Sequence, residues 1–167
     1  WIKKEIEKSI LGDQMITRIY NGINTEIFKP YDKALTRKEF GLPIDKKIVA
    51  FGVRGWLDSN KIVDSYIGKD DVFFVAIGHS NTKTKNKNFT AFSYTENRNL
   101  LCKYLSAADV FFYPTQGDSF GLIVAETLSS GTPVVTYNID AMPEIVVHKD
   151  TGYITERANA ESARAGL

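Results

Sequence analysis

The sequence predicts an open α/β domain built on a doubly wound parallel sheet. Five short runs are rich in Val, Ile and Phe and are apolar on consecutive residues rather than on alternate ones. Strands covered on both faces have this pattern. Segments with helical spacing lie between the runs, and such alternation is typical of a parallel sheet. A chain of 167 residues is long enough for one domain with its own core.

The predicted strands cover residues 48–53, 72–77, 89–93, 110–114 and 133–137. Ligands of open α/β sheets bind beyond the carboxyl ends of the strands. We therefore expect the functional residues in the segments at those ends, which are residues 52–61, 78–80, 115–121 and 138–144.

Three helices are predicted between the strands. One spans about residues 61–67. A second begins at Thr95, a helix-capping residue type, and continues with apolar residues at helical spacing. The third spans residues 121–130, and Gly131 is placed to end it. The tail, residues 158–167, is expected to be helical or frayed.

The composition disfavours several classes of protein. A formal net charge of +1 lacks the basic excess of a nucleic-acid binder, so no nucleic-acid partner is expected. The lone Cys102 allows no internal disulfide, fits a reducing cytosol and is expected in the core. No apolar run approaches the roughly 20 residues that span a bilayer, and no signal peptide is visible. The chain starts at Trp1 rather than Met, so we expect a fragment of a longer protein.

The sequence contains no motif for binding a metal ion or a dinucleotide. Two separated histidines and one cysteine do not make a zinc site, so no metal is expected. A glycine-rich dinucleotide fingerprint and a Walker A sequence are both absent. His79 follows the strand at 72–77, where it either contacts a ligand or is a loop residue without a role.

The strongest functional signal follows the fourth predicted strand. Residues 115–122 read TQGDSFGL, a loop with two glycines that leads into a helix. The start of a helix offers free backbone N–H groups and the positive end of the helix dipole. Such a place suits a phosphate or polarised sugar hydroxyls. Two interpretations stay open: either Asp118 or Ser119 is only a helix cap, or Asp118 is a ligand-binding carboxylate.

Glu126 lies in the same helix, which is apolar on most faces. A carboxylate there must be near a surface or serve a partner, because an unpaired buried charge is costly. From its position it is expected to reach a ligand lying over the start of the helix.

Several motifs, in order, resemble one family. They are YNGINTEIFKP (20–30), LSAADV (105–110), DSFGLIVAE (118–126), SGTPVV (130–135), PEIV (143–146) and TGYI (151–154). Together they resemble the C-terminal, nucleotide-sugar-binding domain of retaining GT-B glycosyltransferases of the large glycosyl transferases group 1 family. The match covers about residues 1–155 and implies a Rossmann-like fold, with residues 1–167 as one half of a GT-B enzyme.

The resemblance implies roles for individual residues. Asp118 would bind hydroxyls of the transferred sugar, and Glu126 the ribose. The backbone N–H groups around Phe120, Gly121 and Leu122 would meet the sugar and phosphate. Arg54 and Lys61, which follow the first strand, would hold the diphosphate and stabilise its charge as it leaves. The assigned set is Asp118, Arg54 and Lys61 as catalytic residues and Glu126, Ser119, Phe120, Gly121, Leu122, Gly52 and His79 as substrate-binding residues.

The sequence departs from the family pattern at three places. Asp118 stands where the family usually has Glu, which shortens the side chain by one methylene. Ile62 replaces the glycine that usually follows the lysine. Asp140-Ala141-Met142 replaces the usual Gly-Gly before Pro143, so ligand contacts of this loop are in question.

The resemblance also implies the activity of the whole protein. It would move a sugar from a nucleotide-diphosphate-sugar to a hydroxyl with retention, in bacterial surface polysaccharide synthesis, without a cofactor or metal. A carbohydrate or lipid-linked acceptor would bind to an N-terminal domain absent from this chain, which alone would transfer nothing. We expect a cytoplasmic location, at the inner face of the membrane. Two alternatives stay open: a non-catalytic nucleotide or nucleotide-sugar binding module, and a GT-B-fold nucleotide-sugar epimerase.

Overall fold

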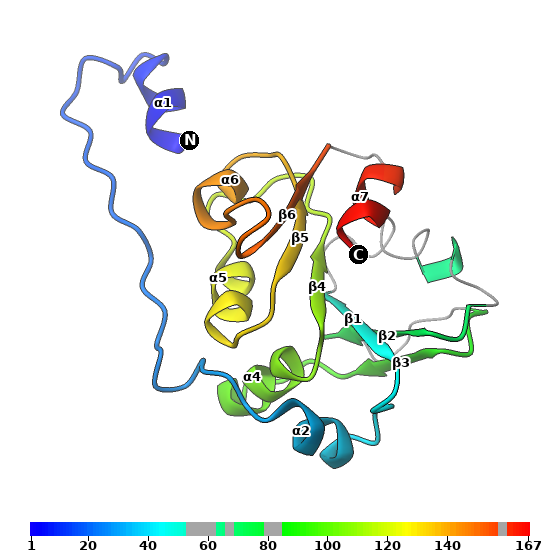
Figure 1. The fold of residues 1–167 in the computed structure, drawn as a ribbon. Helices are drawn as coiled ribbons and strands as arrows, with labels where there is room; N and C mark the ends of the chain where they lie inside the picture. The colour runs from blue at the N-terminus through cyan, green and yellow to red at the C-terminus, as the bar shows by residue number, and fades with distance from the viewer. Residues whose placement is uncertain (53–62, 66–68, 79–84, 157–159) are drawn as a thin grey trace.

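A six-stranded, fully parallel sheet forms the centre of the molecule (Figure 1). The computed structural model describes residues 1–52, 63–65, 69–78, 85–156 and 160–167. The strands are β1 (Lys47–Gly52), β2 (Val72–Ile77), β3 (Phe89–Phe92), β4 (Val110–Tyr113), β5 (Val134–Tyr137) and β6 (Gly152–Thr155). The five predicted strands are confirmed, with ends that differ by one residue at most where the residues are described.

The strand order is β3-β2-β1-β4-β5-β6. β1 pairs with β2 on one side and with β4 on the other, so the chain reverses its direction of travel across the sheet between β1 and β4. This point is where a doubly wound sheet opens a crevice at the carboxyl ends of its strands. The predicted α/β fold class is therefore confirmed.

The edge strand β6 was not predicted. Its four residues begin with a glycine and are only partly buried over most of their length, so they lack the continuous apolar pattern of the inner strands. β6 exists as a strand through its pairing with β5, in which Val134 lies opposite Gly152. This pairing joins residues that are distant in sequence, and no local pattern announces it.

Gly152 is required by this pairing, and its replacement is expected to be strongly destabilising. A Cβ at this position would overlap the backbone oxygen of Val134 and lie 2.9 Å from a methyl group of Val146. Because backbone cannot move aside as a flexible side chain does, Gly152→Ala should lower the free energy of unfolding by about 2–3 kcal/mol. Gly22→Ala is the matched control, since a Cβ there would meet nothing within 4 Å. Chemical denaturation measures both, and equal stability of the two variants would contradict the prediction.

The helices other than α1 lie around the sheet, and α1 stands apart from it at the end of a long extended segment (Figure 1). They are α1 (Ile2–Glu7), α2 (Lys33–Glu39), α4 (Arg98–Ser106), α5 (Leu122–Ser129), α6 (Met142–Ile145) and α7 (Ala160–Gly166). The predicted helix at 121–130 is confirmed as α5, and Gly131 follows it with φ of +80°, the left-handed conformation that ends helices. Of the helix expected at 61–67, residues 63–65 are described and are helical. The tail is helical in α7.

The predicted cap of α4 is wrong. Asn97, not Thr95, is the N-cap, and its side chain accepts a hydrogen bond from the Leu100 N–H at 3.1 Å. Thr95 accepts from the Asn97 N–H instead. Both residue types suit a cap, so the sequence offered two possible starts.

Two buried clusters lie on the sheet. One includes Cys102, which is fully buried as expected, with Leu105 and Phe111. The other includes Phe51 and Phe112. Alternate residues of β1 and β4 thus point to opposite faces, and both faces are covered, as the uninterrupted apolar strands require.

One polar cluster ties α2 to the amino-terminal ends of β1 and β4. Arg37 is buried, and its guanidinium donates to the Asp109 carboxylate at 2.7 Å and to the backbone oxygen of Ala107 at 2.9 Å. Asp109 also accepts from the Ile48 N–H at 2.8 Å and from Lys33 at 3.1 Å. Asp109, the acidic residue of the LSAADV motif, therefore has a structural function.

Candidate functional site

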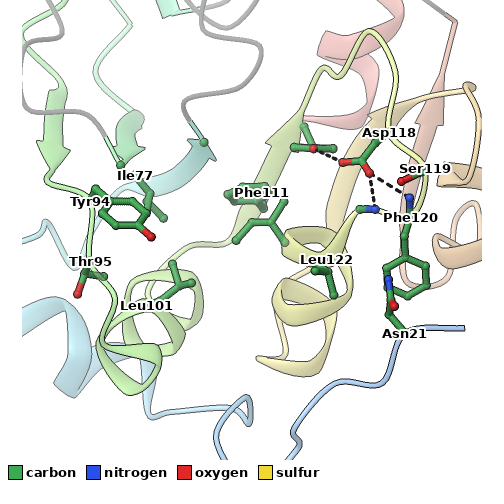
Figure 2. A pocket seen from close by; sticks show the side chains of 15 residues that line it. Asn21, Ile77, Tyr94, Thr95, Leu101, Phe111, Asp118, Ser119, Phe120 and Leu122 are labelled. Carbon is green, nitrogen blue, oxygen red and sulfur yellow. Dashed lines mark hydrogen bonds between the residues drawn. The ribbon is translucent and has the colours of Figure 1, made fainter.

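A cavity of about 390 Å³ lies at the carboxyl ends of β1, β2 and β4. It opens at the point where the strand order reverses, and Figure 2 shows it between α4, which carries Leu101, and α5, which carries Leu122. The residues that line it are Asn21, Gly52, Ile77, Gly78, Tyr94, Thr95, Leu101, Phe111, Tyr113, Asp118, Ser119, Phe120, Gly121, Leu122 and Ile123. This is the place expected for a ligand of a doubly wound sheet.

Most of the predicted site residues within the described part of the chain meet at this cavity. They are Gly52, Asp118, Ser119, Phe120, Gly121 and Leu122. Arg54, Lys61 and His79 lie outside the described residues. The segment 138–144 contributes no residue to the lining of this cavity, but its Asp140 bonds the Asp118 loop.

Asp118 organises the loop between β4 and α5. Its Oδ1 accepts from the N–H groups of Phe120 at 3.0 Å and Gly121 at 2.7 Å, and its Oδ2 accepts from the Tyr113 hydroxyl at 2.7 Å. Figure 2 shows these bonds holding the carboxylate at the edge of the cavity. Asp118 thus accepts hydrogen bonds from N–H groups just before α5, much as a helix cap does. The N-cap residue of α5 itself is Gly121, with φ of +83°.

The amino-terminal end of α5 has donors free for a ligand. Among the described residues, no acceptor bonds the N–H of Leu122 or Ile123. Both residues line the cavity, and the helix dipole makes this end favourable for an anion. The N–H groups of Phe120 and Gly121, which were expected to meet the ligand, are occupied by Asp118.

Asp140 fastens the same loop from the other side. Its backbone has φ of +49°, a left-handed conformation that Asp tolerates better than most residues. Its Oδ2 accepts from the Asp118 N–H at 3.1 Å. Asp140 is the first residue of the segment that replaces the usual Gly-Gly. It thus keeps a backbone conformation typical of glycine and adds a carboxylate that holds the Asp118 loop.

Glu126 is buried on α5, with 5% of its surface exposed. Its Oε1 accepts from Arg98 Nη1 at 2.8 Å. Burial raises the pKa of Glu126, and the charge and hydrogen bond of Arg98 offset part of that effect. Glu126 does not line the cavity itself, but it follows Ile123 and Leu122, which do, by three and four positions. Residues at these spacings share one helix face.

Sequence reasoning missed several residues of the site. Tyr94 is one of them: it is 75% exposed and lines the cavity. Asn21, Thr95 and Tyr113 also line it. Arg98 was not singled out, although a carboxylate on an apolar helix signals that a cation must be near.

The described part of the chain holds neither a metal-binding cluster nor a membrane-spanning helix. No group of three or more His, Cys, Asp or Glu residues there is arranged to hold a metal ion. None of its helices is both long and apolar enough to cross a bilayer.

The fold and the cavity define a doubly wound α/β domain with a ligand site at the switch point of its sheet. Residues 65–167 match the family described as Glycosyl transferases group 1, and the chain belongs to this family. The sheet with its flanking helices matches the Rossmann-like architecture of GT-B glycosyltransferases.

Individual proteins are similar to this chain in sequence or in fold. The D-inositol 3-phosphate glycosyltransferase of Mycobacteroides abscessus is 28% identical over 167 residues, which cover 86% of this chain and 36% of that protein. Sucrose-phosphate synthase from Thermosynechococcus elongatus superposes with a TM-score of 0.77 at 21% identity, over 99% of this chain and 46% of that one. Anabaena Alr3699/HepE in complex with UDP and glucose gives a TM-score of 0.70 at 16% identity, over 88% and 45%. The chain thus spans less than half the length of each of these proteins.

Proposed function

We propose that this chain is the donor-binding domain of a retaining glycosyltransferase that moves a sugar from a nucleotide-diphosphate-sugar to an acceptor hydroxyl. The observation that supports it best is the cavity at the switch point of the sheet. Free N–H groups at the start of α5, the carboxylate of Asp118 and the buried Glu126 all lie in or beside it.

The chemistry of such a donor fits the groups at the cavity. The diphosphate gains negative charge as it leaves, and fixed hydrogen-bond donors directed at it stabilise that charge in the transition state. The N–H groups of Leu122 and Ile123 are such donors, and the helix dipole adds to their effect. Arg54 and Lys61 stay predicted as the cations that complete this site, in place of a metal.

The supporting comparison is with Alr3699/HepE, which binds UDP and glucose and has a similar fold. By analogy, a uridine or other nucleoside diphosphate sugar is the proposed donor. The acceptor, carbohydrate or lipid-linked, would bind to an N-terminal domain outside this chain, which alone would not catalyse transfer. We place the full-length protein in polysaccharide synthesis in the cytoplasm, at the inner face of the membrane.

A thermal-shift screen of UDP-, GDP- and ADP-sugars tests donor binding. A ligand at 100 times its Kd should stabilise the fold by about 2.7 kcal/mol. Glu126→Gln should weaken binding of the best ligand by roughly tenfold or more, because a neutral amide replaces a charged acceptor. The matched control is Glu26→Gln, an exposed residue, which should bind as the wild type does. If none of these nucleotide sugars stabilises the wild-type chain, the proposal is wrong.

A further inference from the structure

The ion pair formed by Arg98 and Glu126 joins α4 and α5, the two helices that carry the cavity-lining residues Leu101 and Leu122. Arg98 is the first residue of α4, three positions after Thr95 and three before Leu101, both of which line the cavity. Glu126 faces it from α5, one helical turn beyond Leu122. Figure 2 shows Leu101 and Leu122 on these two helices at the mouth of the cavity. The pair therefore bridges the two helices between which a ligand would lie.

The two residues are buried unequally, and this difference decides how the loss of Arg98 would change the protonation of Glu126. Glu126 is 5% exposed, whereas the side chain of Arg98 is 56% exposed. The guanidinium also lies 5.9 Å from the centre of the Phe28 ring. The arginine keeps much of its contact with water, and the carboxylate does not. Loss of Arg98 would thus leave a buried carboxylate unpaired, which favours its protonation.

Arg98 is the only charged group among the described residues that acts on the Glu126 carboxyl. Of the ionisable groups on the elements packed against α5, Lys103 of α4 pairs with Glu39, and Cys102 contacts the Ser130 hydroxyl. Glu26 and Lys29, in the segment before α2, and Tyr137 of β5 do not act on it. Within the described part of the chain, no donor bonds Glu126 Oε2.

We propose that Arg98 is a positioning residue for the donor site: its bond to Oε1 holds Glu126 ionised and oriented, with Oε2 left to accept from a ribose hydroxyl. This inference rests on the proposed function, because it takes Glu126 as the residue that binds the nucleotide. In this arrangement Arg98 does not contact the ribose itself. It sets the charge and direction of the group that does.

Nucleotide affinity measured against pH tests the proposal. Calorimetric titrations with UDP, GDP and ADP would compare the wild type with Arg98→Gln, Arg98→Lys and Glu126→Gln between about pH 5.5 and 8.5, a range that spans the expected titration of a buried, unpaired carboxyl. Each Kd is taken relative to the wild type at the same pH, which removes the titration of the nucleotide. Thermal melting checks that each variant is folded.

The proposal predicts a distinctive pattern. The relative Kd of Arg98→Gln should be about tenfold or more above the wild type at the acidic end and should fall toward the wild type as the pH rises, because the carboxyl regains its charge. Arg98→Lys, which keeps a positive charge, should stay close to the wild type throughout. Glu126→Gln, which has no charge to regain, should stay weaker than the wild type and should not approach it as the pH rises.

Other outcomes separate two kinds of failure. If Arg98→Gln weakens binding by the same factor at every pH, or does not weaken it, Arg98 does not control the charge of Glu126 and the inference is overturned. If Glu126→Gln binds like the wild type, or none of the three diphosphates binds, the proposed function itself fails. Should Arg98→Gln not fold, carboxyl NMR of Glu126 replaces the binding test. Glu126 must then titrate at the same pKa in Arg98→Lys as in the wild type, and a higher pKa in a folded Arg98→Ala is required.

Discussion

Arg37→Ala is expected to lower the free energy of unfolding by about 3 kcal/mol or more, because it removes one partner of a buried ion pair. The lost groups include the donor to Asp109 at 2.7 Å and the donors to the backbone oxygens of Ala107 and Lys46. These bonds join α2 to the starts of β1 and β4, so their loss affects the centre of the sheet. Such a change is a large share of the stability of an ordinary domain.

Lys38→Ala is the matched control for this change. Lys38 lies next to Arg37 on α2 and carries the same charge, but it is exposed, so little effect is expected. Urea denaturation followed by circular dichroism gives both values. Comparable stability of the two variants would show that the Asp109 cluster contributes little.

The same cluster predicts how stability depends on pH. Burial raises the pKa of Asp109, but hydrogen bonds from the Ile48 N–H, Arg37 and Lys33 outweigh this and leave the pKa below its ordinary value. A carboxylate with a lowered pKa stabilises the fold above the pKa of the unfolded chain, about 4, and loses this contribution as the pH falls through the folded value. Arg37→Ala should therefore lose less stability than the wild type on acidification below about pH 4.

Under the proposed function, Asp118→Ala is expected to have the largest effect on activity, with sugar transfer by the full-length protein reduced by about a hundredfold or more. The carboxylate holds the N–H groups of Phe120 and Gly121 and the Tyr113 hydroxyl at the cavity. Its removal also takes away the capping of the α5 end, which should cost about 1 kcal/mol of stability. Sugar transfer and nucleotide binding should be measured on the same preparations.

Asp118→Glu is the control, because it keeps the negative charge and introduces the residue that the family usually has at this position. The longer side chain reaches further into the cavity but must leave some bonds that Asp118 makes to its own loop. Retained nucleotide binding with lost transfer in Asp118→Ala supports an enzyme. Unchanged activity would favour a non-catalytic binding module, in which Asp118 acts only on the loop.

The site shows where prediction from local pattern succeeds. Asp118 and the residues to Leu122 were expected at the cavity because a short apolar strand, two glycines and a helix follow one another in the chain. The strand places the loop at the carboxyl end of the sheet, and the helix start places its N–H groups there. Whether Asp118 faces a ligand or its own loop is not written in this pattern, because both uses call for a short acidic residue. In the structure the carboxylate bonds Phe120, Gly121 and Tyr113 and also lines the cavity, so its role toward a ligand stays a prediction.

The sequence alone determined the class of the fold, the inner strands, α5 with its end at Gly131, and the edge of the sheet where the cavity lies. Each follows from neighbours in the chain, through hydrophobic periodicity or the conformational demands of glycine. Only the tertiary structure decided that β6 joins the sheet, that Arg37 pairs with Asp109 across 72 positions, and that Arg98 pairs with Glu126 across 28. These pairings depend on how α2, α4 and α5 pack on the sheet. A contact between residues that are distant in the chain produces no periodic pattern in the sequence around either residue, so local patterns do not predict it.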